Sequence, residues 1–114
     1  MEMRFTKQDN DIRLIQLIGK LDSTGSSEIE TKFTGYCAGD KVRVIVDFAR
    51  VDFLASMGIR LLMSAAQSVS RRGGKMVIVN PIPDVQHVLE AAGIPAVIPV
   101  YSYLESAETV LMAS

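Results

Sequence analysis

Apolar and polar residues follow two different periods along the chain, and the first segments are typical of β-strands. Residues 12–18 are apolar and rich in branched side chains, and residues 3–7 precede them across the polar segment Gln8-Asp9-Asn10-Asp11. Branched apolar runs on either side of turn-forming residues indicate two strands joined in a hairpin. We therefore predict two antiparallel strands at the start of the chain.

A helical period begins after the segment Gly19-Lys20-Leu21-Asp22. The apolar residues that recur every three or four positions are Ile29, Phe33, Tyr36 and Cys37. Ser27 and Glu30 have the spacing of a capping box, and Gly39 can end a helix. The first helix is therefore predicted to begin after Ser27 and to end before Gly39.

The rest of the chain alternates strands and helices. Apolar runs typical of strands lie at residues 42–48 and 76–79, and Pro99 interrupts a shorter run at 97–100. Helical spacing is found in three sets: Ile59, Leu62, Met63, Ala66 and Val69; Val85, Val88, Leu89 and Ala92; Leu104, Ala107, Val110 and Leu111. The predicted order is ββαβαβα(β)α, an α/β fold with a mixed sheet of four to five strands and about four α-helices.

Composition limits the classes of function. A chain of 114 residues, 48% of them hydrophobic, can bury one core, so we expect a single domain over residues 1–114. The net charge of −1 and the scattered cations argue against a nucleic-acid partner. The single cysteine, Cys37, cannot form an internal disulfide, and no apolar leader or membrane-spanning run is expected. These features predict a cytoplasmic protein that does not insert into membranes.

Candidate enzymatic and metal sites are weak in this sequence. Ser56, Asp84 and His87 are the residue types of a nucleophilic triad, but residues 54–58 lack the G-x-S-x-G turn of hydrolases. One histidine and one cysteine without close spacing do not make a metal site. Gly73-Gly74 follows a predicted helix, whereas a phosphate-binding loop would precede one. We expect no catalytic residue, no metal ligand and no cofactor.

Three aspartates lie at or just after predicted strand ends: Asp22, Asp47 and Asp52. They could meet at one edge of the sheet, although aspartate at such positions more often caps a helix or forms a turn. Ser56 lies where the second helix is predicted to begin. A serine directly before the first helical residue typically stabilises a helix by about 1 kcal/mol, so capping is the favoured role of Ser56 on this pattern alone.

A resemblance to a known family changes that weighting. Residues 44–62, with residues 19–22 before them and residues 72–75 after them, resemble a STAS domain, the fold of anti-sigma-factor antagonists and of the cytoplasmic tails of sulfate transporters. The similarity is greatest to the stand-alone antagonists. Their signature is an apolar strand ending in Asp, an apolar pair, and Asp-Ser-Ser/Thr-Gly-Leu at the start of a helix. The corresponding residues here are Asp47, Phe53-Leu54 and Ala55-Ser56-Met57-Gly58-Ile59.

The resemblance implies a non-enzymatic protein that is phosphorylated on Ser56. Its unphosphorylated form would bind a GHKL-type serine kinase that is also an anti-sigma factor, and a PP2C-like phosphatase would remove the phosphate. The residues that the resemblance assigns to partner contact are Asp22, Ser23, Ala55, Met57, Gly58, Ile59 and Arg60. The alternatives are a STAS scaffold or subunit of a transport or stressosome-like complex that is not switched by phosphate, and a small hydrolase using Ser56.

Overall fold

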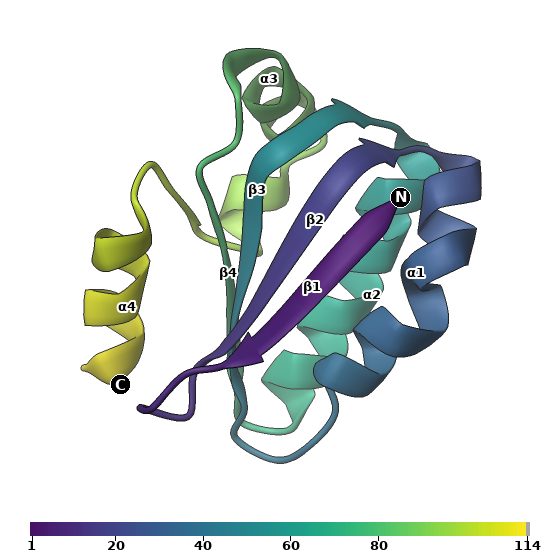
Figure 1. Ribbon diagram of the computed structural model, residues 1–114. Coiled ribbons are helices and arrows are strands. Elements are labelled where there is room, and N and C mark those ends of the chain that lie inside the picture. Colours follow the sequence, from purple (N-terminus) through teal and green to yellow (C-terminus); the bar gives the residue numbers. More distant parts are fainter. Residues whose placement is uncertain (114) are drawn as a thin grey trace.

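The structure of the protein, a computed structural model, describes residues 1–113 (Figure 1). Its strands are β1 (Glu2–Lys7), β2 (Arg13–Leu21), β3 (Arg43–Leu54), β4 (Lys75–Val79) and β5 (Val100–Tyr101). Its helices are α1 (Ser23–Tyr36), α2 (Ser56–Arg71), α3 (Pro83–Ala91) and α4 (Leu104–Met112), with a 3₁₀-helix, η1, at Ile94–Ala96. The five strands form one sheet in chain order, in which β1 is antiparallel to β2 and the later neighbours are parallel. The predicted order of elements and the mixed sheet are confirmed.

The sheet separates two hydrophobic cores. From β2 onwards, each new strand is parallel to the one before it and is added at the same edge of the sheet. Right-handed crossovers therefore place α1 and α2 on the same face of the sheet. Figure 1 shows these two helices side by side, α4 on the opposite face, and α3 beside the end of β3. The larger core includes Phe33, Phe48 and Leu62, and the smaller core, under α4, includes Ile45 and Leu111; all five side chains are fully buried. The layer of α1 and α2 therefore rests on the larger core.

Strand β3 continues well beyond Asp47, where the resemblance placed the end of this strand. β4 pairs with β3 as far as Asp47, and the rest of β3 pairs with β2 alone. Two register shifts each leave one extra residue in β3, between Asp47 and Arg50 and between Val51 and Phe53. Bulges of this kind bend a strand and break its alternation of buried and exposed side chains. The expected strand end was wrong because the bulges hide the extension from the sequence pattern.

Helix α1 begins more than one turn earlier than the capping box at Ser27 and Glu30 predicts. Its N-cap is Asp22, whose Oδ1 accepts a hydrogen bond from the amide of Gly25 at 2.8 Å. The extra turn buries Gly25 and Ser26, which are too small to appear in a hydrophobic pattern. The prediction that the helix begins after Ser27 was therefore wrong, because the periodicity of large apolar residues starts only in the second turn.

The first turns of α1 and α2 both lie against the end of β2. A Cβ atom built on Gly25 would lie 2.1 Å from the carbonyl oxygen of Lys20, and one on Gly58 would lie 2.7 Å from that of Leu21. The amide of Ala55, directly before α2, donates a hydrogen bond to the carbonyl oxygen of Leu21 at 3.1 Å. The two helices consequently begin side by side at this edge of the sheet, as Figure 1 shows.

Replacing Gly58 with alanine should destabilise the protein by about 1–3 kcal/mol or more, because the added methyl group collides with Leu21. Gly35→Ala is the matched control, since Gly35 also lies in a helix but a Cβ atom there meets nothing within 4 Å. We expect that control to be neutral or to gain up to about 1 kcal/mol from better helix propensity. Urea unfolding measures both variants, and an unchanged free energy of unfolding for Gly58→Ala would contradict the close packing.

The only cysteine, Cys37, is buried with 6% of its surface exposed. Burial raises the pKa of the Cys37 thiol from its ordinary 9.0 to about 12, against the opposing effect of the Arg13 cation. Because the thiolate is the reactive form, the native thiol should not react with a disulfide reagent at pH 8, and unfolding should expose it. The higher pKa in the folded state also means that the free energy of unfolding falls as the pH rises from about 9 towards about 12. Rapid labelling of the native protein at pH 8 would contradict this expectation.

Candidate partner-binding surface around Ser56

Ser56 is the first residue of α2, and its side chain is exposed. The N-cap is Ala55, which has an extended backbone (φ −124°, ψ 178°) and gives the helix no side-chain cap. The prediction that Ser56 caps α2 is therefore wrong, because an N-cap residue lies before the helix and Ser56 lies within it. The exposed hydroxyl of Ser56 is accessible to a modifying enzyme.

The first turn of α2 favours a negative charge. It contains no acidic residue, and its first intrahelical hydrogen bond runs from the amide of Ile59 to the carbonyl of Ala55 at 3.1 Å. The earlier amides of an α-helix have no acceptor within the helix, and together with the helix dipole they create a partial positive charge. An anionic group on Ser56 would therefore be stabilised by the helix to which it is attached.

The residues assigned to partner contact differ in their exposure. Those that are exposed are Ser23, Met57 and Arg60. Those that are half-buried are Asp22, Ala55 and Ile59. Gly58 is buried against Leu21, so it supports the surface from beneath instead of contacting a partner directly.

Two large apolar side chains close to Ser56 in the chain are exposed. The exposed fraction is 49% for Phe53 and 43% for Met57. Sequence reasoning placed Phe53 in the apolar pair of the signature and did not predict its exposure, because the register shift that precedes it is not visible in the sequence. Flexible methionine and exposed aromatic side chains are common at contact surfaces. The surface around Ser56 therefore combines apolar side chains with a site for negative charge.

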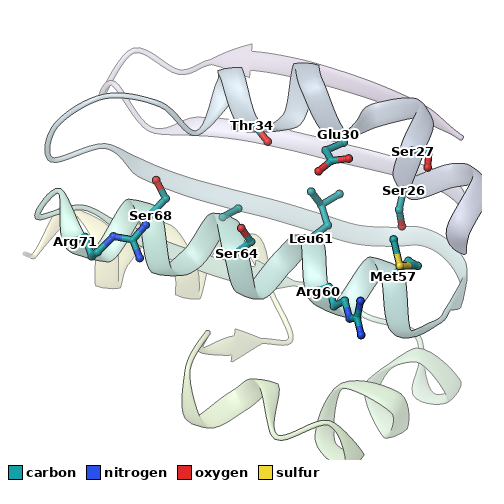
Figure 2. A pocket seen from close by; sticks show the side chains of 11 residues that line it. Ser26, Ser27, Glu30, Thr34, Met57, Arg60, Leu61, Ser64, Ser68 and Arg71 are labelled. Carbon is teal, nitrogen blue, oxygen red and sulfur yellow. The ribbon is translucent and has the colours of Figure 1, made fainter.

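A groove with a volume of about 440 Å³ lies between α1 and α2 (Figure 2). Most of its polar lining consists of hydroxyl groups, those of Ser26, Ser27, Thr34, Ser64 and Ser68. Its charged lining residues are Glu30, Arg60 and Arg71. The hydroxyl of Ser26, a residue with 4% of its surface exposed, has no hydrogen-bond partner in the described part of the chain. Met57 and Arg60 line one end of this groove, which therefore continues the surface around Ser56.

The three aspartates of the sequence analysis do not share one site. Asp22 caps α1, and Oδ1 of Asp47 accepts a hydrogen bond from the amide of Ala49 at 2.9 Å. Asp47 pairs with Gln16, which precedes Asp22 by six residues, about 20 Å of strand at roughly 3.3 Å per residue. Asp52 is exposed near the end of β3. The expected capping role is confirmed for Asp22. Asp47 lies within β3 at the first register shift, so neither its expected place at a strand end nor a meeting with Asp22 at one edge of the sheet is found.

The other candidate chemistry gains no support from the described residues. Asp84 and His87 are exposed on α3, and within residues 1–113 no hydrogen bond joins either side chain to Ser56. Across the same range, no three His, Cys, Asp or Glu side chains are grouped so that they could hold a metal ion. None of the helices described is both long enough and apolar enough to cross a membrane.

Comparisons with known proteins agree with this fold. Residues 4–107 match the family model for the STAS domain. The chain is 26% identical over 106 residues to BtrV of Bordetella bronchiseptica, a protein provisionally named an anti-sigma factor antagonist, and the alignment covers 92% of this chain and 91% of BtrV.

Two solved structures show the same fold. An anti-sigma-factor antagonist (STAS) domain protein from Planctomyces limnophilus has a TM-score of 0.86 and 23% identity, with 98% of each chain covered. The Bacillus cell fate determinant SpoIIAA in its phosphorylated form has a TM-score of 0.67 and 22% identity, with 96% of this chain and 99% of SpoIIAA covered. The STAS anti-sigma antagonists are binding modules and not enzymes, which agrees with the sequence expectation. With its family model matched over nearly all of its residues, the chain belongs to the STAS domain family.

Proposed function

We propose that this protein is an anti-sigma-factor antagonist whose binding to its partner is controlled by phosphorylation of Ser56. The observation that carries the proposal is the exposed hydroxyl of Ser56 at a helix N-terminus without a side-chain cap, with Met57 and Phe53 exposed nearby in the chain. The provisional name of BtrV and the existence of a phosphorylated form of SpoIIAA support it.

The proposed partner is a GHKL-type serine kinase that also acts as an anti-sigma factor. It binds the unphosphorylated surface around Ser56 and transfers the γ-phosphoryl group of ATP to the serine. In that step the Oγ–P bond forms, the bond from the γ-phosphorus to ADP breaks, and the hydroxyl proton passes to a base on the kinase. The exposure of Ser56 supports this role, since the attacking oxygen must enter the active site of another protein.

The physical basis of the switch is a change in surface charge. A phosphate carries a charge of about −1.5 to −2 at pH 7. The positive end of α2 accommodates it, so the fold is retained. Burying the same charge in a contact that also covers Met57 requires its desolvation, which is strongly unfavourable without a matching cation on the partner. The phosphorylated form therefore releases its partner.

The cycle is completed by a PP2C-like phosphatase. It hydrolyses the phosphate ester with water, which returns the hydroxyl of Ser56 and releases inorganic phosphate. We place the cycle in the cytoplasm, where ATP is available to the kinase.

The proposal predicts that the protein isolated from its native cells carries one phosphoryl group on Ser56. Removal of the phosphatase should raise the phosphorylated fraction, because the ester is then no longer hydrolysed. Intact-mass spectrometry with peptide mapping measures this fraction.

Ser56→Ala should abolish the modification. Ser64→Ala is the control: it removes another exposed serine of the same helix and should leave the modification unchanged. An unmodified Ser56 in cells that lack the phosphatase would contradict the proposal. A scaffold or transport subunit that is not switched by phosphate would then be the better explanation.

A second prediction concerns affinity. Ser56→Asp should weaken binding to the cognate kinase at least about tenfold, because a carboxylate must be desolvated in the contact. Ser56→Ala should keep the affinity of the wild type. Ser106→Asp is the matched control, since Ser106 is also exposed in the first turn of a helix, but in α4 on the opposite face of the sheet. Isothermal titration calorimetry gives the dissociation constants, and equal weakening by both aspartates would refute a contact centred on Ser56.

A further inference from the structure

Arg60 lies four residues after Ser56, one turn further along α2. Residues with this spacing are neighbours on a helix surface, and long helical side chains point back towards the helix N-terminus. Figure 2 shows the guanidinium of Arg60 turned towards the Met57 end of α2. Both Ser56 and Arg60 are exposed, so a group attached to Ser56 lies within reach of this side chain.

The guanidinium of Arg60 is available for a new partner. Within residues 1–113 its side chain takes part in none of the ion pairs or side-chain hydrogen bonds. Glu30 lines the same groove from α1, but it forms no ion pair with Arg60 in the described structure. Arginine binds phosphate through two parallel N–H donors, which a single unpaired guanidinium provides.

The start of α2 offers a phosphate a further source of stabilisation. No side chain caps the helix and no acidic residue lies in its first turn, so nothing in that turn competes for its amides. Helix α1 differs in this respect, because Asp22 already supplies it with a negative cap.

We propose that Arg60 is the internal partner of a phosphate on Ser56 and that phosphorylation draws its guanidinium to the N-terminal end of α2. The proposal rests on the function proposed for Ser56. It adds a second consequence of modification, because the positive charge of Arg60 is then paired with the phosphate and is no longer available to a partner. A partner that contacts both Ser56 and Arg60 meets a phosphate and a cation that is already paired.

The test uses protein in which phosphoserine is incorporated at position 56 during synthesis, so that no kinase is needed. Phosphorus NMR follows the second ionisation of the phosphate, whose pKa is about 6 in an unpaired phosphoserine. A guanidinium favours the dianion and lowers this pKa. Arg60→Gln should therefore raise the pKa of the phosphate by about half a unit, and Arg60→Lys, which keeps a point charge, should raise it less.

Arg71→Gln is the matched control. Arg71 lines the same groove, but it lies eleven residues after Arg60, about 16 Å along the helix axis. Its replacement should leave the phosphate pKa unchanged. Equal pKa values in the wild type, Arg60→Gln and Arg71→Gln would overturn the proposal.

A measurement on the unsubstituted protein guards against variants that fold poorly. Nitrogen NMR of the arginine side chains should show a shift of the Nε–H signal of Arg60 on phosphorylation, with the signal of Arg71 unchanged. An Arg60 signal that is identical in both forms would also overturn the proposal. Absence of phosphate on Ser56 in cells would refute the proposed function instead, since these measurements do not depend on a kinase.

Discussion

The close approach of two helix starts to the end of β2 determines the geometry of the whole surface. Gly58 and Gly25 let α2 and α1 lie against the backbone of Leu21 and Lys20 at distances that exclude a side chain. The amide of Ala55 adds a hydrogen bond to Leu21. Because these contacts involve backbone atoms, they fix where α2 begins with little dependence on the exposed side chains around it. The exposed residues of that turn are therefore free to serve recognition.

This geometry also requires the extension of β3. Leu54, the last residue of β3, pairs with Leu21, the last residue of β2, and both are buried. The chain therefore enters α2 beside the end of β2. The extension pairs with β2 alone and has two register shifts, which allow it to bend over the larger core. The same irregular segment exposes Phe53. A feature that shapes the fold thus also supplies an apolar side chain to the surface.

Much of the fold could be predicted because its core residues are large and regularly spaced. The periodic apolar residues identified the strands, the helices and their order, and the resemblance located Ser56 at the start of α2. The start of α1 could not be predicted, because its first turn packs through Gly25 and Ser26, which carry no hydrophobic signal. The buried face of α2 was partly mispredicted for a similar reason. Ile59 and Met63 belong to the predicted apolar set but are only half-buried, whereas Leu61 and Ala65, outside that set, are buried. Packing against the neighbouring helix, which the sequence does not reveal, decides which side chains of α2 are buried.

The departure of this chain from the signature has a physical consequence at the N-cap. The signature has Asp where this chain has Ala55, and the structure places that position at the N-cap of α2. An aspartate there accepts hydrogen bonds from the first amides, and alanine forgoes roughly 1 kcal/mol of that stabilisation. The amides and the positive end of α2 then have no carboxylate of their own, so a phosphate on Ser56 meets no competing negative charge at the cap. In the proposed phosphorylated form, a stronger interaction at the helix N-terminus would offset the stability that the absence of a cap costs the unmodified form.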